Sequence, residues 1–350
     1  QEYEFHPVDM GSVTHRIIEL FSRKVELEEG SWEGLTEETR NKLIDECVDQ
    51  VAEEYGHQIL HSSARNEFVI ERLRRILRRT AWALQKQILA GSFRPAGYEV
   101  SFTQVADLDA VNIALSEEEK MRLKGKIDRI DTCEKDGEVY IKVIDYKSGN
   151  KSFDLVALYY GLQLQLVVYL NAAVEMEQRI HKEKKIIPAG IFYYHVKDPM
   201  LTGKDTESAE EISSEILREL KLTGLVSSDK KVYREMDQHF AGTSDVIPVA
   251  ENKDGTLSKR SKAVKKEQFH TLSSFVQEKM KELGRRMLDG EIAAVPFERK
   301  TQTGCDYCIY RSICRMDPKL PGTHYRRLKE YSEEMIWKKM ENQEDGNELD

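Results

Sequence analysis

Two strand-like segments joined by a short turn constrain the fold of this chain more than any other feature. Residues 124–133 (KGKIDRIDTC) and 138–149 (EVYIKVIDYKSG) are strand-like, and the sequence KDG at 135–137 is typical of a tight turn. A third such segment, EVSFTQV, precedes them at 99–105. The pattern predicts three strands, of which the last two pair as an antiparallel hairpin.

Helical periodicity surrounds these strands. Apolar side chains recur every three or four residues on either side, which is the spacing of one helix face. The sequence predicts helices at about 10–28, 36–60, 68–89, 153–178, 208–222 and 267–289, and a further strand at 189–196. This order predicts an α/β fold in which an αβββαβ core carries additional helices.

The 350 residues, 40% of them apolar, are enough for one large domain, and we expect it to span 1–330. Its expected parts are a core at about 10–200, a charged insertion at about 200–266 that ends in a mobile basic loop (250–266), and a C-terminal helix and cysteine segment at 267–316. Residues 331–350 are expected to follow as an acidic C-terminal tail that starts as a helix.

The composition argues against several classes of protein. Acidic residues outnumber basic ones by 62 to 53, and this net charge of -9 argues against a protein that grips nucleic acid by bulk positive charge. No apolar run approaches the length of about 18 residues typical of a membrane-spanning helix, and no secretion signal is readable. A phosphate-binding loop for ATP is missing as well. We expect a bacterial cytoplasmic protein, and the absence of an initiator Met suggests a fragment of a longer one.

Charged residues interrupt the strand-like segments, where an unpaired carboxylate is costly to bury. Asp145 and Lys147 share one face of their strand, and the KDG turn can bring Asp128 close to Asp145. Two carboxylates and an ammonium suit metal-dependent phosphodiester hydrolysis, because carboxylates hold Mg²⁺ and a lysine can orient water. A D-x-K pair on its own more often belongs to a surface salt-bridge ladder, so the combination carries the interpretation.

Three motifs in order resemble a known family. G-x-I-D-R-I-D (125–131), I-D-Y-K-S-G (144–149) and G-L-Q-L-Q-L-V-V-Y-L (161–170) resemble RecB-type nucleases of the PD-(D/E)XK superfamily, and among them the C-terminal nuclease domains of AddB-type subunits. The likeness extends from M-G-S-V-T-H (10–15) through F-Y-Y-H-V-K-D-P (192–199) to the C-terminal cysteines. It implies the PD-(D/E)XK fold and a deoxyribonuclease that depends on Mg²⁺ or Mn²⁺.

The resemblance implies roles for the charged strand residues. Asp128 and Asp145 match the family's acidic metal ligands, and Lys147 matches its catalytic lysine. Glu99, on the first predicted strand, could add a carboxylate, but we do not include it in the expected site.

Three residues on predicted helices also match the family. His15 matches a histidine that completes the metal shell, although a lone histidine beside an apolar stripe is more often a boundary residue. Gln165 and Tyr169 match the signature Q-x-x-x-Y and lie one turn apart on one helix face, where they are expected to position the substrate or the metal ligands. The alternative is that both residues only cap the core.

Three of the five cysteines, Cys305, Cys308 and Cys314, lie together near the C-terminus. This grouping indicates metal or cluster ligation rather than disulfides, and both zinc and iron–sulfur sites take four ligands. The resemblance implies a [4Fe–4S] cluster whose first cysteine lies upstream of His15. The sequence departs from that pattern, since its first cysteine is Cys47, so we expect the cluster to be incomplete or absent here.

Two basic segments are candidate DNA contacts. The candidates are Arg72, Arg75 and Arg79 on a predicted helix, and Lys259 and Arg260 in the basic loop. Most such runs are solvated faces paired with nearby acids; the alternative is a track for the phosphates of single-stranded DNA. Nothing in the sequence reads bases, so contact with the backbone is expected.

By the same resemblance we expect an exonuclease domain that processes double-strand breaks and cuts the 5′-ended strand. Its partner would be an AddA-like helicase–nuclease that supplies a single strand from an unwound duplex end. The open alternatives are a catalytically silent scaffold that binds DNA ends, a stand-alone RecB-like iron–sulfur exonuclease, and a zinc-stabilised interaction domain.

Overall fold

The structure is a computed structural model that describes residues 7–28, 30–55, 63–102, 107–201, 208–314, 316–320 and 322–344. The main sheet contains β1 (Arg94–Ser101), β4 (Lys126–Lys135), β5 (Glu138–Lys147), β6 (Lys185–His195), β7 (Thr223–Ser227) and β8 (Ala263–Val264). Two smaller sheets contain β2 (Asn112–Ala114) with β3 (Lys120–Arg122), and β9 (Phe297–Arg299) with β10 (Gln302–Thr303) and β11 (Arg326–Arg327). The helices are α1 (Pro7–Glu28), α2 (Glu37–Glu54), α3 (Ala64–Leu89), α4 (Leu155–Tyr159), α5 (Gln165–Ile180), α6 (Ala209–Glu219), α7 (Lys230–Tyr233), α8 (Lys266–Leu288), α9 (Arg311–Cys314) and α10 (Glu333–Glu344).

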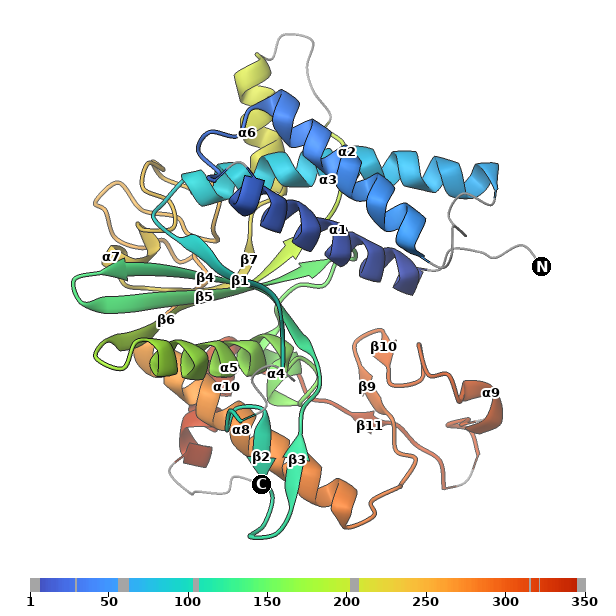
Figure 1. The fold of residues 1–350 in the computed structure, drawn as a ribbon. Coiled ribbons are helices and arrows are strands. Elements are labelled where there is room, and N and C mark those ends of the chain that lie inside the picture. Colours follow the sequence, from blue (N-terminus) through green and yellow to red (C-terminus); the bar gives the residue numbers. More distant parts are fainter. Residues whose placement is uncertain are drawn as a thin grey trace.

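The main sheet lies between two layers of helices (Figure 1). Its strand order is β1-β4-β5-β6-β7-β8. The β1–β4, β4–β5 and β6–β7 pairs are antiparallel, whereas the β5–β6 and β7–β8 pairs are parallel. Helices α1, α2 and α3 cover one face, and α4, α5, α8 and α10 cover the other (Figure 1). The predicted αβββαβ order is therefore present as α1, β1, β4, β5, α5 and β6.

The central hairpin forms as the sequence predicts. Asp136 and Gly137 both have positive φ, 53° and 77°, which is the geometry of a tight two-residue hairpin turn. The first strand differs from the prediction, because it begins at Arg94 rather than at 99. Pro95 is tolerated inside it since β1 is an edge strand, where a missing N–H breaks no ladder bond on the open side.

Successive side chains of β5 point to opposite faces of the sheet and pack into two separate hydrophobic cores. Ile144 packs with Ile17 and Leu77 from α1 and α3, whereas Val143 packs with Leu166 from α5 on the opposite face. All five side chains are 1% exposed or less. A strand buried on both faces has little room for charge, so each charged residue in it needs a specific partner.

The predicted helix at 153–178 is wrong as a single element. It is divided into α4 and α5, and the break contains Gly161 with φ of 81°, a left-handed conformation that ends a helix. The apolar run hides this break from a periodicity argument. As a result, Gln165 begins α5 instead of lying in the middle of a long helix.

The C-terminal third is more ordered than the sequence suggests. The basic segment 250–266, predicted to be a mobile loop, is tied to its neighbours: Lys262 N–H donates to Pro248 O at 2.9 Å, and β8 joins the main sheet. Helix α10 also packs on the core, with Ile336 and Met340 fully buried. Among the described residues, no helix combines the length and apolar character that a membrane span requires.

Candidate active site

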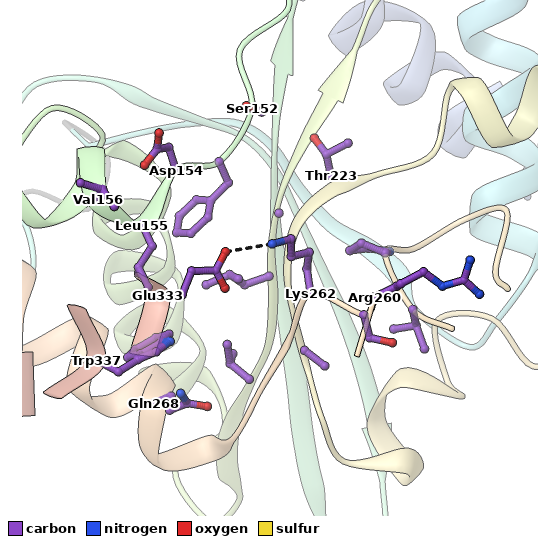
Figure 2. A pocket seen from close by; sticks show the side chains of 18 of the residues that line it. Ser152, Asp154, Leu155, Val156, Thr223, Arg260, Lys262, Gln268, Glu333 and Trp337 are labelled. Atoms are coloured by element: carbon purple, nitrogen blue, oxygen red, sulfur yellow. Dashed lines mark hydrogen bonds and ion pairs between the residues drawn. The ribbon is translucent and has the colours of Figure 1, made fainter. Parts of the chain in front are cut away.

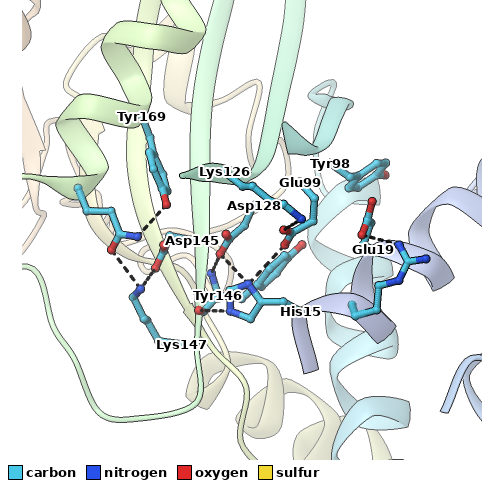
Figure 3. A network of polar contacts seen from close by, with 12 residues as sticks. His15, Glu19, Tyr98, Glu99, Lys126, Asp128, Asp145, Tyr146, Lys147 and Tyr169 are labelled. Carbon is cyan, nitrogen blue, oxygen red and sulfur yellow. Dashed lines mark hydrogen bonds and ion pairs between the residues drawn. The ribbon is translucent and has the colours of Figure 1, made fainter. Parts of the chain in front are cut away.

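Strands β4 and β5 separate near the carboxyl end of β5. Regular pairing between them ends at Arg129 and Ile144. One residue further on, Oδ2 of Asp128 accepts a hydrogen bond from the Tyr146 N–H at 2.7 Å (Figure 3). A carboxylate thus replaces a backbone partner, and the sheet opens where its charged residues gather.

Asp145 lies at this opening and is incompletely paired. The residue is 1% exposed, and its Oδ2 lies 2.6 Å from Nζ of Lys147. Its Oδ1 accepts no hydrogen bond from the part of the chain that the structure describes. Burial, together with the charge of Asp128, raises the pKa of Asp145 to about 6. A buried carboxylate with an unused oxygen is poorly suited to a structural role, but well suited to bind a cation.

His15 reaches the same place from α1. Its Nε2 lies 3.0 Å from the carbonyl oxygen of Tyr146, which can only accept, so Nε2 carries the proton of the neutral ring. Nδ1 then faces Asp128 and Glu99, at 3.4 Å from an oxygen of each. Burial alone lowers the pKa of His15, but the bonds and charges of the two carboxylates raise it to about 10. A proton on Nδ1 therefore occupies the position that a metal ion can take.

Glu99 completes this group, although the sequence argument left it out. The ligand atoms of His15, Glu99 and Asp128 all lie within 4.8 Å of one another. Glu99 has φ of 47°, an unfavourable left-handed conformation for a residue with a side chain. Strained backbone of this kind is found where function fixes a side chain, and here it accompanies a carboxylate that contacts His15. No sequence pattern marks a positive φ at a glutamate.

The donor set fits a divalent cation such as Mg²⁺ or Mn²⁺. Carboxylate oxygens are the ligands these ions prefer, and an imidazole held by a backbone carbonyl is a common additional ligand. The unused oxygen of Asp145 shows that the carboxylates are not already saturated. A cleft of about 430 Å³ gives access to the group and is lined by Gly11, Ser12, His15, Arg16, Glu19, Glu99 and Lys126.

Lys147, Gln165 and Tyr169 form a chain on the other side of Asp145 (Figure 3). Nζ of Lys147 lies 3.2 Å from Oε1 of Gln165, whose Nε2 donates to the Tyr169 hydroxyl at 2.8 Å. Burial raises the pKa of Tyr169, so it stays a neutral phenol. The break at Gly161 places Gln165 on the first turn of α5, where its amide can face the strand.

A second lysine, missed by the sequence argument, lies near Lys147. The Nζ atoms of Lys147 and Lys151 lie 5.7 and 6.0 Å from the centre of the Tyr193 ring. Burial and the positive charge of Lys147 lower the pKa of Lys151. Two ammonium groups over one ring make the region beside Asp145 attractive to a phosphate.

A larger cavity than the cleft beside His15 lies elsewhere, between the β7–β8 edge and the helices α4 and α10 (Figure 2). It measures about 770 Å³, and the ion pair of Lys262 and Glu333, 2.9 Å apart, spans it. Arg260, a predicted DNA contact, lines this cavity, and the neighbouring Lys259 is exposed. The cavity contains none of the residues that gather at the split between β4 and β5, so size does not identify the chemical site here.

The arginines predicted to contact DNA lie on α3 and differ in their surroundings. Nε of Arg75 lies 2.9 Å from Oδ2 of Asp198, as expected for a solvated face. Arg79 lies over the Trp82 ring, with 5.8 Å between its guanidinium carbon and the ring centre. Arg72 is exposed and makes no ion pair with any described residue.

The three clustered cysteines lie beside the small β9–β10–β11 sheet, in a lobe apart from the main sheet (Figure 1). Cys305 is partly exposed, and Cys308 and Cys314 are exposed; all three are free thiols. Their sulfurs do not form a set within 4.8 Å of one another, the spacing for one shared ion. Three thiols are also one short of the four ligands that a zinc or [4Fe–4S] site needs, so the described residues do not complete one.

Comparisons with known proteins agree with the predicted family. A family model described as PD-(D/E)XK nuclease superfamily matches residues 1–315. The B subunit of the ATP-dependent helicase/deoxyribonuclease of Caldanaerobacter subterraneus subsp. tengcongensis is 39% identical over 350 residues, and its counterpart in Clostridium acetobutylicum is 40% identical over 348 residues. Each alignment covers 99% of this chain but only 30% of the relative, so the chain spans about 30% of the length of these relatives. Because the family model includes every strand and helix that carries the site, the chain belongs to the PD-(D/E)XK nuclease superfamily.

Proposed function

We propose that this chain is a metal-dependent exonuclease domain that hydrolyses phosphodiester bonds of single-stranded DNA. The observation that carries the proposal is the carboxylate of Asp145, which is buried beside the group of His15, Glu99 and Asp128 and leaves one oxygen unused. A structural carboxylate at that depth would need full compensation. The arrangement is instead what a site for a divalent cation requires.

His15, Glu99, Asp128 and Asp145 would hold Mg²⁺ or Mn²⁺. When bound, such an ion neutralises charge that develops on the phosphate and makes water a better nucleophile. The protein's own part is to hold the ligand atoms of His15, Glu99 and Asp128, from α1, β1 and β4, within 4.8 Å of one another, with Asp145 of β5 beside them. Because two of those donors are fixed by the backbone of residue 146, little rearrangement is needed for binding.

Lys147 acts on the reacting groups, and Gln165 and Tyr169 position it. The Lys147 ammonium is held between Asp145 and the amide oxygen of Gln165, so its remaining proton points in a fixed direction. That proton can bind the attacking water or a phosphate oxygen whose charge grows in the transition state. Tyr169 accepts from Gln165 and so fixes which way the amide faces.

The wider role is proposed from the relatives' name, since the B subunit of a helicase/deoxyribonuclease implies DNA and a helicase. We propose an AddA-like helicase–nuclease partner that supplies the single strand, and double-strand break processing on the 5′-ended strand. Residues 1–330 would form the nuclease domain, with α10 packed against it. Cys305, Cys308 and Cys314 would supply three ligands of a [4Fe–4S] cluster, with the fourth cysteine from the longer protein.

The test is degradation of a labelled linear single strand with Mg²⁺ or Mn²⁺, and with EDTA in place of metal. Asp145→Ala and Lys147→Ala should each lower the rate by about a hundredfold or more, while the far-UV circular dichroism stays that of the unsubstituted chain. Lys184→Ala is the matched control, because this surface lysine pairs with Glu134 at the opposite end of the hairpin. It should cut at the original rate.

Equal cleavage by all the variants would show that the activity lies elsewhere, and would refute the site. If the chain is silent, the same assay on the longer protein with all four cysteines decides between the proposals. Metal-dependent cleavage there would support the nuclease, and continued silence would favour a scaffold that only binds DNA ends.

A further inference from the structure

A row of cations leads along the chain into the cleft. Lys120, Arg122, Lys124 and Lys126 alternate from β3 into β4, and the row stops two residues before Asp128. In Figure 1, the β2–β3 hairpin extends away from the main sheet beside α8, and the chain runs from β3 back into the sheet as β4.

The four cations lie two residues apart along the chain, from β3 to the first residue of β4. All four are exposed, whereas Leu123 packs against the core between them and Ile127 is fully buried. In extended chain, residues two apart are separated by about 6.6 Å. That distance is close to the separation of successive phosphates in a stretched single strand, so a strand laid along the row meets one cation per phosphate.

The outer three cations have no acidic partner among the residues that the structure describes. Lys120 and Lys124 make no ion pair with any residue in the described ranges, and Arg122 only donates to Oδ1 of Asn112 at 3.2 Å. Some surface lysines elsewhere are paired: Lys279 and Lys281 each lie 2.6 Å from a glutamate three residues away. The three outer cations are therefore available to an external anion, although the exposed Glu117, Glu118 and Glu119 directly precede Lys120 in the chain.

The inner end of the row lies at the group of His15, Glu99 and Asp128, which we call the metal group. Nζ of Lys126 is 3.6 Å from Oε2 of Glu99, and Lys126 lines the 430 Å³ cleft together with His15 and Arg16 (Figure 3). Lys126 is thus anchored by Glu99, whereas the outer cations are free to bind an external anion.

We propose that Lys120, Arg122, Lys124 and Lys126 form a phosphate track that holds one DNA strand by its backbone and leads it to the metal group. The inference rests on the proposed function for the identity of the polyanion. A flexible single strand fits the row because it can follow an extended chain into a narrow cleft, which a duplex cannot. Contacts to phosphates alone predict binding without sequence preference and with strong salt dependence.

The test is equilibrium binding of a fluorescent oligo(dT) at several salt concentrations in EDTA, where metal-dependent cleavage cannot interfere. The row variant is K120Q/R122Q/K124Q, and the matched control is K182Q/K184Q/K185Q, which removes the same charge at the turn between α5 and β6. The row variant should bind about tenfold more weakly at low salt. Its plot of log affinity against log salt should be shallower by about 2, because each phosphate contact to a single strand contributes about 0.7 to the slope. The control should keep the original affinity and slope.

Unchanged affinity and slope in the row variant would overturn the track and leave an acidic protein surface as the candidate partner for these cations. Failure of the unsubstituted chain to bind oligo(dT) would overturn it too. Row-dependent binding without cleavage in Mg²⁺ or Mn²⁺ would count against the proposed nuclease and leave the track standing. If cleavage depends on Asp145 but the row variant binds as tightly as the original chain, the nuclease proposal stands and the track is refuted. A thermal unfolding midpoint within a degree or two of the original excludes misfolding of the exposed-residue variant.

Discussion

The β4–β5 hairpin buries charged residues on both of its faces, but it compensates them differently. On the face toward α1–α3, Asp131 takes two bonds of 2.6 Å from Arg129, and Lys142 lies 3.3 Å away. All three residues are 2% exposed or less. On the face toward α5, Asp145 forms an ion pair only with Lys147 among the described residues, and one of its oxygens accepts no hydrogen bond from them.

The two aspartates have opposite pKa shifts for this reason. Burial opposes ionisation of Asp131, but the charges of Arg129 and Lys142 outweigh it and lower the pKa. Burial and the charge of Asp128 raise the pKa of Asp145 to about 6. Burial is common to both, so the difference lies in the neighbouring charges: Asp131 lies beside two cations, whereas Asp145 lies beside the carboxylate of Asp128 and pairs with one lysine. Complete compensation marks a structural charge, whereas incomplete compensation marks a place prepared for something else to bind.

The largest expected effect is on the compensated face. Asp131→Asn leaves Arg129 and Lys142 buried without an anion and should lower the free energy of unfolding by about 3–5 kcal/mol. Asp145→Asn, made in the same strand pair, should change it by no more than about 1 kcal/mol in EDTA, because the lost charge was poorly compensated. Urea denaturation of both variants measures the difference. Equal losses would remove the distinction between the two faces.

Acid titration provides the control for that result. The pKa of Asp131 in the folded state lies below its ordinary value of 3.8, so its contribution to stability is complete above about pH 4. It is lost as the pH falls through the lower, folded-state value. The stability gap between the original chain and Asp131→Asn should therefore shrink below pH 4, and a gap independent of pH would contradict the ion-pair explanation.

The next largest effect is stabilisation by metal, which should depend on Asp145 on the face toward α5. Mg²⁺ or Mn²⁺ at a hundredfold excess over its dissociation constant should stabilise the original chain by about 2.7 kcal/mol. Asp145→Asn should abolish this gain, and Lys184→Ala should keep it. Thermal unfolding with and without metal gives both values. A metal-dependent shift that persists in Asp145→Asn would place the bound ion elsewhere.

A smaller change in the free energy of unfolding is expected at Glu99, where two substitutions distinguish the effect of backbone strain from that of the charge. Glu99→Gly relieves the positive φ and should raise the free energy of unfolding by about 1 kcal/mol, while it weakens metal binding. Glu99→Gln keeps the strain and removes the charge, so it should weaken metal binding without the gain in stability. Urea denaturation in EDTA measures the change in stability, and metal titration measures the change in metal affinity. A glycine variant no more stable than the glutamine variant would show that the conformation costs nothing.

The smallest effect is expected at Tyr169. Tyr169→Phe removes the acceptor for the Gln165 amide and should cost about 0.5–1 kcal/mol. Cleavage should fall less than about tenfold, since the phenol positions Gln165 and does not touch the phosphate. A loss as large as that of Lys147→Ala would promote Tyr169 to a catalytic residue.

Much of the fold could be predicted because it depends on local signals. The KDG turn, the alternation in β4 and β5 and the amphipathic stripe of α1 are readable in the sequence, and they bring Asp128, Asp145 and Lys147 into one region. The division between α4 and α5 could not be read, because the apolar run continues across Gly161 and only the backbone conformation shows the break.

The missed site residues share a physical cause. Glu99 belongs to the site through a left-handed φ and a strand register that no residue type encodes. The cations from Lys120 to Lys126 carry no recognisable sequence signal, because they are separated by single uncharged residues, whereas the arginines at 72–79 form a dense run on one helix. Pairing with acids does not separate the two sets, since each contains paired and unpaired cations: Arg75 and Lys126 lie beside carboxylates, whereas Arg72 and Lys124 have no acidic partner in the described part of the chain. What distinguishes the strand set is that Lys126 lines the cleft beside Glu99.

The backbone of residue 146 orients two of the proposed metal ligands. Its N–H binds Asp128 and its carbonyl binds His15, so a single peptide segment aligns donors from two layers of the molecule. The Tyr146 side chain takes no part in either bond. Any amino acid except proline, which lacks the N–H, can supply the same two groups. The alignment therefore depends on main-chain groups and not on the residue type at 146. A substitution there that preserves the edge-on packing against the His15 ring, with 6.0 Å between ring centres, should leave both bonds in place.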